Sequence, residues 1–162
     1  MLKKAICLLI ALYMSVSLLG CKSNSYLDDL SCAQLISVAK DSVTTESGYE
    51  PMSAGRSEYA FGDLKYDDMA IIVSIATENI DEIGVFHATS PDAAKEISTA
   101  LEVYLTELLE EKGAFIVSYA PSELEKLEKA EVRMFGNYVA YAILSREGRS
   151  AVFMTLEGEI KS

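Results

Sequence analysis

Apolar residues recur along this chain with two periods, and each period predicts one kind of element. The longest helical stripe follows Ser90 and Pro91 and continues to Gly113, with apolar members at Ala94, Ile97, Leu101, Tyr104, Leu105 and Leu108. Ser90 is a typical N-cap, and Pro91 suits the first helical position because no N–H is needed there. The pattern predicts a long helix over residues 91–113.

Two shorter stretches have the same helical period. Ser31 followed by Gln34 resembles a capping box, and the apolar residues after it predict a helix over residues 28–40. Pro121 opens another predicted helix that ends near Ala130.

Three segments are less well defined. Residues 42–57 are rich in Ser, Thr, Gly and Pro, so we expect a long loop. Residues 114–119 fit a helix, a strand or a loop. Residues 149–160 predict a last helix, although Gly158 leaves a final strand as the alternative.

Strand patterns come in two pairs. Residues 69–76 form a β-branched, nearly continuous apolar run that is typical of a central strand, and residues 82–88 form a second strand after a short polar connection. Residues 131–135 and 138–145 flank Gly136 and Asn137, a pair typical of a two-residue hairpin turn. We therefore expect an α+β fold, a mainly antiparallel sheet of about four strands in two hairpins with helices packed on one face.

The first twenty residues have the features of a signal peptide. Lys3 and Lys4 precede a mainly apolar stretch of fifteen residues, shorter than the roughly 20 residues that a membrane-spanning helix needs. The segment ends in Leu18-Leu19-Gly20-Cys21, which resembles a bacterial lipobox. This resemblance implies cleavage before Cys21 and a diacylglycerol on its thiol; secretion without a lipid is the alternative.

The lipobox predicts how the chain is organised. Residues 1–20 are the signal peptide, residues 21–27 are the lipidated Cys21 and a polar tether, and residues 28–162 form one domain of unknown function. We expect the protein to be anchored through acylated Cys21 in the cell membrane, at its extracytoplasmic face.

Composition and charge limit the classes of partner that the protein is expected to bind. Half of the 162 residues are apolar and 24% are charged, which is typical of a globular chain. The net charge is -11, and it becomes -13 once Lys3 and Lys4 leave with the signal peptide. Nucleic acid is excluded as a partner, because binding to phosphates needs clustered Lys and Arg. Cys7 leaves with the signal peptide and Cys21 carries the lipid, so Cys32 has no cysteine with which to form an internal disulfide. Cys32 is interpreted as a small apolar residue on a helix.

Three motifs together resemble a known family. They are Asp81-Glu82-Ile83-Gly84-Val85-Phe86, Tyr119-Ala120-Pro121 and Gly136-Asn137-Tyr138-Val139. Behind a lipobox, this order is similar to domain-of-unknown-function family 4358, small lipoproteins found mainly in Gram-positive anaerobes. The resemblance implies a surface lipoprotein without assigned activity and carries no catalytic residues. The chain departs from the pattern at His87 and from Arg146 onward.

Candidate chemistry is sparse. His87 is the sole histidine, which rules out a multi-histidine zinc site. It is interpreted as structural, with a general base beside a loop carboxylate such as Asp67 or Glu82 as the alternative. The acidic groups lack the spacing of a calcium loop. No catalytic, cofactor-binding or metal-ligating residue is assigned.

These observations favour a membrane-anchored binding or accessory module over an enzyme. Its ligand would be a membrane-proximal protein or a small molecule, held by the open sheet face, a sheet edge or the 42–57 loop, with Tyr49, Tyr59 and Tyr138 as contacts. The first alternative is a cell-envelope hydrolase using His87 and a loop carboxylate. The second is a passive acidic surface protein.

Overall fold

The computed structural model describes residues 26–44 and 48–161. The predicted signal peptide, the predicted lipidation site Cys21 and most of the predicted tether lie outside this part. Within it, no helix is both long enough and apolar enough to span a membrane.

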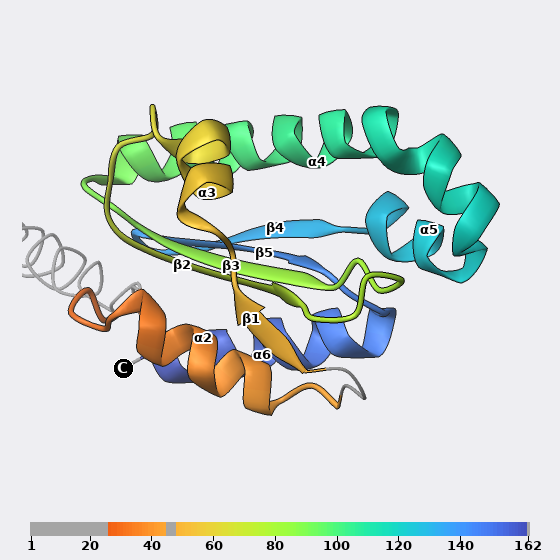
Figure 1. Ribbon diagram of the computed structural model, residues 1–162. Coiled ribbons are helices and arrows are strands. Elements are labelled where there is room, and N and C mark those ends of the chain that lie inside the picture. The colour runs from red at the N-terminus through yellow and green to blue at the C-terminus, as the bar shows by residue number, and fades with distance from the viewer. Residues whose placement is uncertain (1–25, 45–47, 162) are drawn as a thin grey trace, which may run out of the picture.

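The centre of the fold is a five-stranded antiparallel sheet with the order β1-β2-β3-β5-β4 (Figure 1). Both predicted hairpins are present, β2 with β3 and β4 with β5, and β1 adds a fifth strand at one edge. The antiparallel α+β class is thus confirmed. The strands are β1 (Tyr49–Pro51), β2 (Tyr66–Ser74), β3 (Glu82–Ala88), β4 (Glu131–Phe135) and β5 (Tyr138–Ile143).

Helices cover both faces of the sheet, so the expectation of helices on one face is wrong. In Figure 1, α3 and α4 lie on one side, and α2 and α6 lie on the other. The reason is visible in β3, where Ile83 and Val85 face one core and Phe86 and Ala88 face the other. A strand that is apolar on both faces must be covered on both. The helices are α2 (Cys32–Asp41), α3 (Ala54–Phe61), α4 (Pro91–Tyr119), α5 (Pro121–Glu128) and α6 (Arg146–Ile160).

The helix starts follow the predicted capping chemistry. The Ser31 and Gln34 side chains form a reciprocal capping box at the start of α2. The Ser90 hydroxyl accepts from the Ala93 amide, 3.1 Å away, at the start of α4. The last segment is the helix α6 rather than a strand, and the Ser145 hydroxyl caps it.

The predicted end of the long helix at Gly113 is too early. α4 continues to Tyr119, so residues 114–119 are helical. Gly113 is buried, and a side chain there would face Leu109 of α4 itself and Leu124 of α5. A mid-helix glycine costs only about 1 kcal/mol relative to alanine, which packing against α5 can offset.

The long loop expected over residues 42–57 is wrong for its second half. Residues 49–51 form β1, which pairs with β2, and Ala54 begins α3. Met52, between the two elements, is buried in the core. Elements this short contain too few residues to show a period, so their formation depends on tertiary contacts.

The second hairpin turns where the sequence predicts. Gly136 has a positive φ of 64°, whereas Asn137 does not adopt a positive φ. The first hairpin begins earlier than expected, because β2 extends back to Tyr66 through an irregularity between Tyr66 and Asp68. One end of the sheet lies beside the β2–β3 connection, and the other lies beside Gly136.

Candidate functional site

A groove of about 750 Å³ lies at the end of the sheet where the β2–β3 connection meets the α4–α5 junction and the start of α6. We call it the polar groove and define it by Glu78, Asn79, Tyr119, Ser122, Lys126 and Ser145. In Figure 1 this end lies beside α5. Its volume falls in the range typical of ligand sites.

A charged network forms the floor of the polar groove. Lys126 Nζ lies 2.7 Å from Asp81 Oδ1 and 2.8 Å from Glu123 Oε2. Glu123 Oε2 also accepts from the Ile80 amide at 3.2 Å. Burial lowers the pKa of Lys126, but its hydrogen bonds to the two carboxylates outweigh burial and leave that pKa raised. The network fixes α5 to the β2–β3 connection, so the floor is preorganised.

The polar groove continues into two neighbouring hollows. One, of about 310 Å³, is lined by Arg146 and Glu147 and shares Lys126 and Ser145 with the groove. The other, of about 680 Å³, shares Val43 and Thr44 and extends to Tyr49 and Ile75, among other residues. The three hollows are therefore neighbours around this end of the molecule, and we call them together the trough.

Two exposed aromatic rings lie at the edge of the polar groove. Phe115 and Tyr119 stack on the last turn of α4, with ring centroids 4.4 Å apart and an interplanar angle of 28°. Their exposed fractions are 64% and 76%. An exposed aromatic pair is a typical feature of a binding surface, because its apolar area is available to a partner.

Glu82 is buried rather than placed in a loop, contrary to the sequence interpretation. It is 3% exposed, and its Oε1 accepts from the Tyr141 hydroxyl at 2.5 Å and from the Tyr104 hydroxyl at 2.9 Å. Arg56 Nη2 lies 2.6 Å from its Oε2. Burial, followed by the Glu82 charge, raises the pKa of both tyrosines. This network pins α3 and α4 to the sheet.

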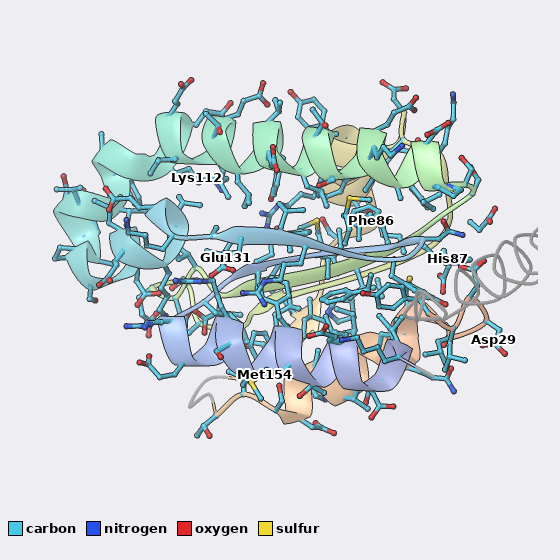
Figure 2. The ribbon with its side chains drawn as sticks, turned by 180° about the vertical axis from the view of Figure 1, so that it is seen from behind. Asp29, Phe86, His87, Lys112, Glu131 and Met154 are labelled. Atoms are coloured by element: carbon cyan, nitrogen blue, oxygen red, sulfur yellow. The ribbon has the colours of Figure 1, made fainter. Side chains whose placement is uncertain are left out.

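His87 pairs with Asp28, and neither predicted partner contacts it. His87 Nε2 lies 2.9 Å from Asp28 Oδ1, and its ring packs on Tyr138 with centroids 4.6 Å apart. Glu82 lies on the opposite face of β3, and Asp67 is exposed beside the irregularity in β2. Figure 2 shows His87 near Asp29, at the end where the N-terminal segment meets the sheet, with Phe86 on the α4 side.

The pair of His87 and Asp28 holds the start of the described chain. Asn137 Nδ2 also donates to Asp28, at 3.1 Å, so that one carboxylate is bound by β3 and by the β4–β5 turn. The Tyr138 hydroxyl donates to the Leu30 carbonyl and accepts from the Leu30 amide. These contacts give His87 a structural role in docking residues 28–30, which follow the predicted tether, onto the sheet.

The three predicted contact tyrosines have different environments. Tyr49 is half-buried, and its hydroxyl lies 3.5 Å from Asp81 Oδ2 below the polar groove. Tyr59 is 94% exposed on α3. Tyr138 is fully buried, so its role as a ligand contact is wrong. Cys32 is buried too, and burial together with the charge of Asp68 raises the pKa of its thiol to about 12, which agrees with an inert core residue.

The motifs that carry the family resemblance separate into two places. Asp81 and Tyr119-Ala120-Pro121, far apart in sequence, meet at the polar groove. Gly136 lies at the other end, against Tyr26 of the tether. Sequence reasoning missed Glu123 and Lys126 because nothing local distinguishes them from other charged residues on a helix surface.

Metal-ligating side chains do not converge in residues 26–44 and 48–161, where no group of three or more His, Cys, Asp or Glu could hold an ion.

Residues 53–144 match the family described as "Domain of unknown function (DUF4358)". No curated protein and no solved structure matches the chain.

Proposed function

The chain belongs to the DUF4358 family, and on that premise we propose that it is a lipid-anchored binding module at the extracytoplasmic face of the membrane. The polar groove would hold its ligand. The lipobox at Cys21 supports the anchor, and the preorganised floor of the groove supports a binding role.

The observation that carries the proposal is the position of the polar groove relative to the tether. The tether meets the sheet where Tyr26 pairs with Lys161 and Asp28 contacts His87. The groove lies beyond the opposite end of β3, beyond Glu82. Glu82 and His87 are five positions apart along β3, which corresponds to about 17 Å. A chain anchored through Cys21 would therefore present its groove away from the membrane.

The chemistry of the groove favours binding over catalysis. Asp81 and Glu123 are both engaged by Lys126, so neither carboxylate of the floor is free to act as a general acid or base. The pair of His87 and Asp28, which has the geometry of an acid–base pair, lies at the tether end instead. The open sheet face proposed from the sequence is not available, because helices cover both faces.

Substitution of Cys21 tests the anchor. We expect Cys21→Ser to release the protein from the membrane fraction into the medium, whereas Cys32→Ser should leave it in the membrane fraction. Cys21→Ser protein that stays in the membrane fraction in the same amount as wild type would refute the anchor.

Labelling of intact cells tests the orientation. Wild type should react little with a membrane-impermeant maleimide, because Cys32 is buried and the pKa of its thiol is about 12. Ser122→Cys places a thiol at the groove, and Asp29→Cys places one beside the tether. We expect a large maleimide reagent to label Ser122→Cys faster than Asp29→Cys in cells and both equally in detergent. Equal rates in cells would contradict the orientation.

A further inference from the structure

We propose that the ligand of the polar groove is a neutral glycan chain that lies along the trough and stacks one sugar ring on Tyr119. This inference rests on the proposed function and names the class of ligand. Three features support it: the shape of the trough, the aromatic pair and the charge of the walls.

The shape of the trough fits an extended polymer better than a compact ligand. The polar groove and its two neighbours share residues at both junctions, Ser145 and Lys126 on one side and Val43 and Thr44 on the other. A small molecule would occupy the central hollow alone. A chain of several sugar rings could occupy all three.

The aromatic pair provides a platform for a sugar ring. One face of a pyranose ring presents several C–H groups, and these pack against the electron-rich face of an aromatic ring. Tyr119 lines the groove, and its ring is supported by Phe115, 4.4 Å away. Because the rings stack on each other, Tyr119 is partly ordered before any ligand binds, which lowers the entropic cost of binding.

The walls of the groove provide hydrogen-bonding groups suited to sugar hydroxyls. Ser122 and Ser145 offer exposed hydroxyl groups, and Glu78 offers an exposed carboxylate. A hydroxyl group both donates and accepts, so such walls complement a polyhydroxylated ligand. Most of the residues that line the groove are polar, so it offers little of the apolar surface that usually anchors a protein partner.

The charge of the groove disfavours anionic polymers. Three carboxylates, Glu78, Asp81 and Glu123, line it against one lysine, Lys126. The whole chain is strongly acidic as well, with a net charge of -11. A phosphate-rich polymer would be repelled, whereas a neutral glycan would not.

Calorimetric titration of the full chain, purified from membranes in detergent, tests the inference. The probes are three neutral hexasaccharides, the β-1,4-linked oligomers of N-acetylglucosamine and of glucose and the α-1,4-linked oligomer of glucose, together with polyphosphate and decalysine. We expect at least one hexasaccharide to bind with a dissociation constant below about 1 mM, the affinity of a weak specific ligand. Polyphosphate should not bind, and decalysine, which the acidic surface attracts, should bind more weakly than that hexasaccharide at about 150 mM salt and with no loss in Tyr119→Ala.

The variants locate the site. Tyr119→Ala should weaken binding of that hexasaccharide by about three- to tenfold, the loss expected for one stacked ring, and Phe115→Ala should weaken it less. Tyr59→Ala is the matched control, because this exposed tyrosine lies on α3 and does not line the trough. All three side chains are largely exposed, so the variants should fold, which circular dichroism can verify.

Three results would each overturn the inference. The first is that none of the hexasaccharides binds, and the second is that polyphosphate or decalysine binds more strongly than the hexasaccharides. The third is that Tyr119→Ala and Tyr59→Ala lose the same affinity for the hexasaccharide. None of them would affect the membrane release of Cys21→Ser. Failure of the ligand assignment is therefore distinguishable from failure of the anchored binding module.

Discussion

Gly84 of β3 faces the ring of Tyr141 on the neighbouring strand β5, and the ring occupies the space that a side chain at Gly84 would need. A Cβ atom built on Gly84 would lie 2.1 Å from Tyr141 Cε1. The Tyr141 ring cannot easily move, because it is fully buried and its hydroxyl is bonded to Glu82. The glycine in this motif is therefore required by packing, not by backbone conformation.

The first prediction concerns this contact. Gly84→Ala should lower the free energy of unfolding by about 3 kcal/mol, because overpacking must displace Tyr141 or the strand. Urea unfolding followed by circular dichroism measures the change. Gly158→Ala is the control: nothing lies within 4 Å of its added Cβ, and it should stabilise α6 by about 0.5–1 kcal/mol. Equal stability of Gly84→Ala and wild type would contradict the packing argument.

The second prediction concerns the buried carboxylate. Glu82→Gln should lower the free energy of unfolding by about 2–3 kcal/mol, because Arg56 loses its ionic partner and the hydroxyls of Tyr104 and Tyr141 both lose a charged acceptor. Glu78→Gln removes an exposed carboxylate and should change stability by less than about 0.5 kcal/mol. Similar unfolding midpoints in urea for the two variants would show that the network contributes little.

The third prediction is a loss of stability at alkaline pH. Burial raises the pKa of the Cys32 thiol from about 9 to about 12. Above pH 9 the unfolded chain releases this proton while the folded chain keeps it, so stability falls as the pH rises towards 12. The expected loss from Cys32 is about 2 kcal/mol between pH 9 and pH 10.5.

Cys32→Ala separates this contribution from that of the buried tyrosines. Their pKa values are raised as well, so they also lower the stability at alkaline pH. Urea unfolding at several pH values should give a shallower decline for Cys32→Ala than for wild type. Parallel declines would show that the thiol does not titrate as its environment implies.

The fourth prediction concerns tether docking. Asp28→Ala removes the acceptor shared by His87 and Asn137, so the start of the described chain should open more often. Hydrogen exchange of the Leu27 and Leu30 amides, which are bonded to Ile160 and Tyr138, should speed up about fivefold. Asp29→Ala, one residue further along, should leave both rates unchanged. Equal exchange in both variants would mean that backbone contacts alone dock the tether.

Short-range signals predicted the elements whose causes are local. Ser31 and Ser90 cap helices as expected, Gly136 makes the hairpin turn, and the strand phase of His87 places it with Ile83 and Val85. The two hairpins follow from apolar runs joined by short polar connections. Each of these features is decided by residues within a few positions of one another.

Tertiary structure alone decided the features that join residues distant in sequence, because such contacts depend on how the helices stack on the sheet. The partner of His87 is Asp28, 59 residues away, and β1 exists only through its pairing with β2. The polar groove combines residues of the β2–β3 connection, α5 and the start of α6, which no sequence period relates. The sequence by itself therefore determined the capped helices and the hairpins, and it contains the motif that resembles a lipobox, while the stacking of helices on both sheet faces determined where the polar groove lies.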